Sequence, residues 1–558
     1  MYRVNPTRRY AGQYRFWIVL LLLLATASCG TQPAPALPPA RTPTTSPAIA
    51  AHATATPVPT PAAASASATP AVAADLSISI DPAGGRHPIS PLIYGLNNPP
   101  SEVLHALRPG INRWGGNPST RYNWRLGNAW NAASDWQYRN GDYGYTGKSA
   151  SDDFMRDTRD ADAAALLTIP TLGWVAKNND TNTCSFPTDD GQCGDASQAN
   201  CEKPGAIADP KRANVPIDVQ SDLEWLRHLK GALYTPQFVA MDNEPDIWGH
   251  THYDVHPSCT TYDEIRDTYL KYAGAVRAQN PNAQLLGPVS CCWYYYWNSA
   301  AGDQDRAAHD GQDFLPWFLQ QVRQHDEAAG VRTLDVLDIH YYPEGLYNDD
   351  ADADTAARRL RSTRSLWDET YVDESWINQP VALIPRMHKL IAQNYPGTKL
   401  GITEWNWGAD RTMNGALALA EVLGIMGRED VYLANYWRYP KPNSPGFYAF
   451  KLFTNYDDQG GHFGNVSLAA TSSQPGWVSA FAAQSDGGRL TLLLINKDPQ
   501  RAATVSLGSP GALPAGQATL FRYSQAAETI VRTTLPGVAP TSLVLPAYSL
   551  SLVVIEAK

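Results

Sequence analysis

Short apolar segments alternate with amphipathic stretches along most of the chain. The stretches 221–234, 265–279 and 314–328 carry apolar residues at helical spacing. Eight apolar segments have the length of buried strands, and several of them end in polar or charged residues: 92–97, 110–114, 165–171, 238–243, 285–288, 336–341, 400–404 and 431–437. Eight strands that alternate with helices predict an α/β fold, a TIM-like (β/α)8 barrel over residues 90–439.

The pattern changes after Pro440 to short alternating strands separated by Gly and Pro turns, for example 489–496, 518–523 and 548–555. This texture predicts an accessory all-β sandwich domain over residues 440–558. A further alternating segment, 76–81, lies ahead of the barrel, and we expect it to join the sandwich as a strand.

The N-terminal residues have the features of an export signal. Four arginines precede the apolar run 16–24, which is too short for a stable membrane span, and small residues then lead to Cys29. The end of this segment resembles a lipoprotein cleavage box and predicts lipidation of Cys29. Because Thr26 stands where such boxes usually carry Leu, ordinary signal-peptidase cleavage stays open. We therefore expect residues 1–29 to be a signal peptide and the protein to be extracellular or held at the cell surface.

Residues 30–75 consist almost wholly of Pro, Ala, Thr and Ser. Such a composition cannot bury enough apolar surface to fold, so it predicts a disordered linker between the cell surface and the barrel. Six further cysteines are compatible with disulfides in an exported chain, but their pairing cannot be read from the sequence. No CxxC occurs, which disfavours a structural zinc site.

Composition narrows the class of partner. The net charge of −10 has the wrong sign for binding a phosphate backbone, so nucleic acid is excluded as a partner. The 17 Trp and 28 Tyr exceed what a core of this size needs, and flat rings stack on pyranose faces, although any single Trp could equally be a core residue. We expect a polysaccharide substrate, no protein partner and a monomer.

Two segments share one construction, in which an apolar strand runs directly into a carboxylate. They are 238–245, which ends near Glu244, and 400–407, which contains Glu404. Strand ends face the active site of a barrel, and glycoside cleavage needs two carboxyl groups with different pKa values. The sequence therefore predicts Glu244 and Glu404 as the catalytic pair, against the alternative that each is an ordinary loop or helix-start carboxylate.

Other polar and aromatic residues near strand ends are candidates for substrate binding. His340 and Tyr342 share one face of a strand and could hold an ionised nucleophile, although a core role is the alternative. The full set of expected binding residues is Arg113, Trp114, Asn117, Asn243, Trp248, His340, Tyr342, Trp405 and Trp437. A groove lined by Trp114, Trp248 and Trp405 would hold successive sugars and predicts cleavage inside chains.

Several other chemistries lack a motif. The chain has no Gly-rich phosphate loop after a strand, no HExxH and no Ser nucleophile elbow. The acidic run 350–354 departs from a calcium loop at Thr355 and Arg361, so we expect it to cap a helix instead. No cofactor is required and no metal ligands are predicted; a structural calcium ion stays open without a motif to support it.

Taken together, the motifs resemble glycoside hydrolase family 44. The resemblance runs from about Pro91 to the C-terminus and rests on 113–117, 242–245 with Trp248 and 250–252, 338–344, 365–376 and 403–408. It implies a barrel with a β-sandwich, retaining cleavage of β-1,4-glucans such as xyloglucan or soluble cellulose, Glu244 as acid/base and Glu404 as nucleophile.

The chain departs from the family pattern at 178–204 and 291–297, which leaves the preferred glucan open. The alternatives are a mannanase or xylanase on the same barrel, or a non-catalytic surface protein that binds polysaccharide.

Overall fold

The computed structural model describes residues 73–142, 149–194, 199–537 and 539–558, and residues 74–558 form one compact unit. The predicted signal peptide, the lipidation of Cys29 and nearly all of the predicted linker lie outside the described residues. None of the helices within the described ranges is long and apolar enough to cross a membrane.

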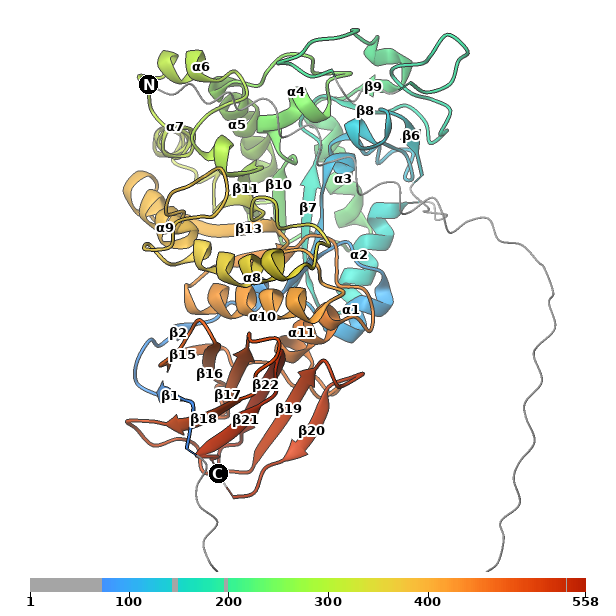
Figure 1. The fold of residues 1–558 in the computed structure, drawn as a ribbon. Coiled ribbons are helices and arrows are strands. Elements are labelled where there is room, and N and C mark those ends of the chain that lie inside the picture. The colour runs from blue at the N-terminus through green and yellow to red at the C-terminus, as the bar shows by residue number, and fades with distance from the viewer. Residues whose placement is uncertain (1–72, 143–148, 195–198, 538) are drawn as a thin grey trace, which may run out of the picture. The chain divides into compact units, whose positions relative to one another are not determined.

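A closed barrel of eight parallel strands forms the first part of this unit (Figure 1). Around the barrel the strands are β3 Gly95–Asn97, β4 Ile111–Trp114, β7 Ala164–Ile169, β10 Phe238–Met241, β11 Gln284–Ser290, β12 Val336–Tyr341, β13 Lys399–Trp405 and β14 Leu433–Tyr436. All eight predicted segments supply a strand. The first one is shorter than expected, because Pro91–Ile93 forms a turn of 3-10 helix that Ser90 caps.

Helices surround the barrel, and their starts follow the expected capping chemistry. Thr261 and Asp352 accept hydrogen bonds from the first backbone N–H groups of their helices, so the acidic run at 350–354 caps a helix as predicted. The helices are α1 Ser101–Leu107, α2 Ala150–Asp160, α3 Val219–Gly231, α4 Trp248–Thr251, α5 Tyr262–Gln279, α6 Asp303–Ala308, α7 Phe314–Ala329, α8 Ala353–Ser362, α9 Leu383–Asn394, α10 Met413–Arg428 and α11 Pro445–Thr454. Short antiparallel pairs extend two loops: β5 Trp130–Asn131 with β6 Asn140–Gly141, and β8 Trp174–Ala176 with β9 Asn214–Pro216.

The second part is a ten-stranded sheet that begins later than predicted. The expected boundary at residue 440 is wrong, because α11 still belongs to the helical layer and the first strand after it starts at Val466. The predicted N-terminal strand does join the sheet. Its strands are β1 Leu76–Asp81, β2 His87–Pro88, β15 Val466–Ser472, β16 Val478–Gln484, β17 Leu490–Asn496, β18 Ala503–Gly508, β19 Ala518–Ser524, β20 Val531–Thr534, β21 Ser542–Leu545 and β22 Ser549–Ile555.

This sheet folds over itself and also covers the barrel. Side chains of β1 and β18 share one apolar core with those of β17, β19 and β22, which are distant from them in the strand order. The opposite face of β16, β17 and β22 packs against the helical layer, so these strands are apolar on both faces. Helix α10, buried on all sides, lies between the barrel and the sheet (Figure 1).

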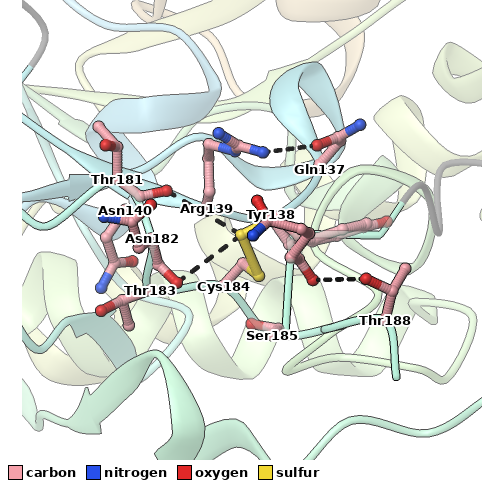
Figure 2. The surroundings of a disulfide bond; sticks show 12 residues. Gln137, Tyr138, Arg139, Asn140, Thr181, Asn182, Thr183, Cys184, Ser185 and Thr188 are labelled. Atoms are coloured by element: carbon pink, nitrogen blue, oxygen red, sulfur yellow. Dashed lines mark hydrogen bonds between the residues drawn. A yellow bond between two sulfur atoms is a disulfide. The ribbon is translucent and has the colours of Figure 1, made fainter. Parts of the chain in front are cut away.

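Three cysteine pairs, which the sequence left unassigned, are resolved by the fold. Cys184 pairs with Cys193 and Cys201 pairs with Cys259, and the neighbours Cys291 and Cys292 also form a bond. The first pair closes a loop within the insertion around 178–204, and the second ties this insertion to Cys259, between α4 and α5. Figure 2 shows the surroundings of Cys184, where the insertion lies against residues 137–140.

Candidate active site

Glu404 lies near the end of β13 with its carboxylate inside the barrel. The Arg113 guanidinium donates to Oε1 at 2.7 Å, and the phenol of Tyr342 donates to Oε2 at 2.8 Å. The register of β13 shifts on both sides of Glu404, against β12 and against β14, which is how strands re-aim a side chain next to a site. Both carboxylate oxygens of Glu404 are therefore held by hydrogen-bond donors.

Glu244 follows β10 and adopts a left-handed backbone, with φ of 50°. Asp242, two residues earlier, is also left-handed. Such conformations cost energy in non-glycine residues and occur at functional sites. The turn directs the Glu244 carboxyl inward, where Nδ1 of His340 lies 2.9 Å from Oε1. No ion pair with a Lys or Arg is formed by this carboxyl within the described residues.

The two carboxyl groups face each other across a narrow gap. Oxygens of Glu244 and Glu404 and a ring nitrogen of His340 all lie within 4.8 Å of one another. Retaining glycosidases hold their carboxyl groups about 5–5.5 Å apart, whereas inverting enzymes need about 6.5–9.5 Å to admit a water molecule. The spacing here has room for direct attack on a sugar carbon.

The surroundings of Glu244 change its acidity. Burial raises the pKa of Glu244 to about 7, with the negative charge of Asp135 adding to the shift and the Arg113 guanidinium opposing it. Glu244 therefore keeps its proton up to about pH 7, as a general acid must.

His340 connects the two carboxyls. Burial lowers the pKa of His340 to about 3, so the imidazole is neutral. Its Nε2 lies 3.1 Å from the hydroxyl of Thr403, which itself donates to Asp338. A proton on Nε2 satisfies this chain and leaves Nδ1 to accept the acidic proton of Glu244.

Arg113 connects several polar side chains of the site. Its side chain is fully buried and donates to Asn97 as well as to Glu404, while its second nitrogen donates to Oδ1 of Asn243 at 2.8 Å. Oδ1 of Asn243 also accepts from the backbone of Gly116, and its Nδ2 lies 3.4 Å from Asn117. The predicted residues Arg113, Asn117 and Asn243 thus meet in one network.

Trp437 lies beside this network. The indole is partly exposed, and a Cβ atom on Gly116 would come within 2.6 Å of its ring, so only glycine permits this approach. Gly116 also has a φ of 91°, which favours glycine. Among the predicted tryptophans, Trp437 is the one that is not buried.

The expectation that Trp114, Trp248 and Trp405 line the groove is wrong. All three are nearly or fully buried, at 3%, 2% and 0% exposure. Successive strand residues point to opposite faces, so the inward Arg113 and Glu404 send Trp114 and Trp405 outward. Trp114 packs among Tyr122, Trp130, Phe154 and Trp225, and Trp405 packs against Trp407 and Tyr436.

Four residues of the site were not among the predicted ones. Asn97, Asp338 and Thr403 contribute polar groups from β3, β12 and β13. Alternation from His340 could have indicated Asp338, whereas Thr403 stands beside Glu404 where the register of β13 shifts. Asp135 lies on the short helical turn η6 Ala133–Trp136, outside the barrel strands, with no pattern in the sequence to mark it.

The same centre contains the one group of three potential metal ligands in the described ranges, Glu244, His340 and Glu404. The Arg113 guanidinium at 2.7 Å from Glu404 already neutralises that carboxylate and would repel a cation. The donor set therefore fits acid and nucleophile chemistry better than metal binding.

Comparison with known proteins gives the family context. Residues 129–345 match the model of glycoside hydrolase family 44. CelM2, a bifunctional glucanase-xylanase from a metagenome library, is 36% identical in sequence to this chain. Its crystal structure matches with a TM-score of 0.80, and the match covers 87% of this chain and 99% of CelM2. A Paenibacillus polymyxa family 44 xyloglucanase is 26% identical with a TM-score of 0.74, over 87% of this chain and all of that one.

A longer relative extends beyond the matched region. The β-mannanase/endoglucanase A of Caldicellulosiruptor saccharolyticus is 30% identical over 478 residues, which are 76% of this chain. The chain spans about a third (34%) of the length of that relative.

Proposed function

Because the chain belongs to glycoside hydrolase family 44, we propose that it hydrolyses internal β-1,4-glucosidic bonds of cell-wall glucans with retention of configuration. The observation that carries this proposal is the pair of carboxyl groups within 4.8 Å, one bonded to the Arg113 guanidinium and one with a raised pKa. Xyloglucan, soluble cellulose and mixed-linkage glucan are the expected substrates.

Each step of the mechanism uses a described contact. Glu404, held by Arg113 and Tyr342, attacks the anomeric carbon while Glu244 gives its proton to the departing oxygen. Glu244, now ionised, then removes a proton from water, which attacks the glycosyl–Glu404 ester and restores both groups. Two displacements give net retention.

Substrate positioning falls to the residues around Arg113 and Asn243. The buried network of Arg113, Asn243 and Asn117 and the indole of Trp437 lie beside the reacting pair. A donor on Asn243 would bind a sugar hydroxyl where hydrogen bonds strengthen in the transition state. These binding roles are part of the proposal.

The experiment is hydrolysis of a panel of xyloglucan, carboxymethylcellulose, mixed-linkage glucan, mannan and xylan, with viscosity and reducing ends followed together. We expect the viscosity of a β-1,4-glucan to fall much faster than reducing ends appear, because cuts are internal. A fall in proportion to reducing ends would contradict internal cleavage, and no turnover on any polymer would favour a binding protein.

Xylan is a second candidate substrate. It is suggested by CelM2, which is described as a bifunctional glucanase-xylanase and is matched over 99% of its length. The catalytic pair does not encode the sugar, so the same panel decides between a glucanase and a dual enzyme.

We also propose export and attachment at the cell surface through Cys29, on the sequence features of residues 1–29. Labelling cells with a radioactive fatty acid tests this. Unlabelled soluble enzyme would contradict the lipid anchor and leave ordinary secretion.

A further inference from the structure

A third carboxyl group, that of Asp135, lies at the catalytic centre. It is partly exposed and belongs to the short helical turn η6 Ala133–Trp136, in the loop between β5 and β6. Oδ1 accepts a hydrogen bond of 3.2 Å from Asn117, which continues through Asn243 to Arg113. The Asp135 carboxylate is also close enough for its charge to act on both Glu244 and Glu404.

The loop that carries Asp135 has an unfavourable backbone. Ala133, Gln137 and Tyr138 all have positive φ, between 52° and 54°, although none of them is glycine. Such conformations persist only where the surroundings enforce them, and they are concentrated at functional sites.

The buried side chain of Asn131 provides part of that enforcement. It accepts from the backbone of Ala133 and donates to the carbonyl of Tyr138, so it closes the loop from both ends.

The disulfide-bearing insertion supports the same loop from outside. The backbone N–H of Ser185 donates to Tyr138, and that of Asn140 donates to Thr183, so the strand around Cys184 runs beside the loop (Figure 2). Arg139 also stacks over the ring of Trp136 at 4.3 Å. Contacts from Asn131 and from the insertion therefore hold this loop, whose helical turn carries the Asp135 carboxylate.

We propose that Asp135 is a substrate-binding residue whose carboxylate accepts hydrogen bonds from hydroxyl groups of the sugar at the catalytic centre. One oxygen is fixed by Asn117, which leaves the rest of the carboxylate to receive hydroxyl donors, as paired oxygens do with vicinal hydroxyls. This inference rests on the proposed glycoside hydrolase function. It adds a ligand group that no strand end supplies.

Charge gives Asp135 a second effect on the reaction. The groups that surround Glu244 are His340 on β12, Arg113 on β4, Glu404 on β13, Asp246 on η8 Pro245–Ile247 and Asp135 on η6. Asp135 is the member of this set that both raises the pKa of Glu244 and lies on a loop. Loss of its charge lowers the pKa of Glu244, so the alkaline limb of activity moves to lower pH.

The test uses cellotetraose and the full chain in two forms. Affinity is measured by calorimetry in an inactive Glu404→Gln background, and kcat/KM against pH is measured with Glu404 intact. Asp135→Asn keeps an oxygen for Asn117 but removes the charge, whereas Asp135→Glu keeps the charge and displaces it. Ser134→Ala, one residue away on the same turn, is the matched control.

We expect Asp135→Asn to weaken cellotetraose about 10- to 100-fold and to shift the alkaline limb to lower pH. Asp135→Glu should weaken binding but leave the limb in place, and Ser134→Ala should change neither by more than about twofold.

Unchanged affinity in Asp135→Asn would overturn the proposal. An equal loss in Ser134→Ala, with a lower thermal midpoint in both variants, would assign the effect to the loop and overturn it as well. Affinity is measured without turnover. A parent chain that binds cellotetraose but does not hydrolyse it would contradict the proposed function, and the affinities would still test the role of Asp135.

Discussion

The ends of β10 and β13 have almost the same sequence pattern, but their glutamates lie in different surroundings. Each is an apolar strand that leads into a glutamate. Glu404 remains within its strand and is bonded to a guanidinium and a phenol. Glu244 lies beyond its strand, in a left-handed turn, with a neutral imidazole as its nearest partner and a pKa raised to about 7.

The difference shows that neighbours across the barrel, not neighbours in sequence, assign the two roles. Arg113 on β4 and Tyr342 after β12 reach Glu404, while Asp135 and burial act on Glu244. A carboxylate paired with a cation stays ionised, and a buried one without such a partner holds its proton.

Replacement of Glu404 by Gln should have the largest effect. An amide cannot attack the anomeric carbon, so we expect kcat on every substrate to fall by about 10⁴-fold or more, as measured by release of reducing ends. Glu344→Gln, a carboxyl just after β12 that contacts neither catalytic residue, should lose less than about tenfold. Equal losses in the two variants would erase the contrast between the strand ends.

The effect of Glu244→Ala should depend on the leaving group of the substrate. Glucan hydrolysis should fall by about 10²- to 10⁴-fold, but an aryl glycoside with a good leaving group needs no acid and should still form the covalent intermediate. Azide, which needs no base, should then accelerate turnover and give a β-glycosyl azide, identified by NMR. An α-glycosyl azide, or rescue confined to Glu404 variants, would show that the two roles are reversed.

Tyr342→Phe sharpens the comparison on the Glu404 side alone. The change removes one donor from Oε2 and should lower kcat/KM by about 10- to 100-fold. Because Tyr342 is not among the groups that shift the pKa of Glu244, the alkaline limb of the pH profile should stay where it is. A shifted limb would mean that Tyr342 also affects the pKa of Glu244, which would contradict the separation of the two sites.

The mildest perturbation is pH itself. The raised pKa of Glu244 keeps the acid protonated below about 7, so kcat/KM should be highest below this value and decline by about tenfold per unit above it. Initial rates on a soluble glucan, with protein stability checked at each pH, give the profile. A profile that stays flat to pH 9 would contradict the assignment of Glu244 as the acid.

Local patterns were sufficient to predict all eight barrel strands and to place a glutamate at the end of both β10 and β13. The strands of a parallel sheet are buried on both faces, so they can be recognised in the sequence as continuous apolar runs. The helix α11 was missed, because its apolar run 445–454 comes after Pro440, where the sequence pattern changes to that of short strands. Only its packing against α10 shows that it still belongs to the helical layer of the barrel.

The tryptophans show how far the sequence could have gone. Once Glu404 is placed inward, alternation already requires Trp405 to point outward, and the same holds for Arg113 and Trp114. The sequence therefore determined which strand residues share a face with the catalytic groups. It did not determine the gap of at most 4.8 Å, the pKa of Glu244 or the approach of Asp135, because each depends on side chains from strands and loops far apart in the chain that only the closed barrel brings together.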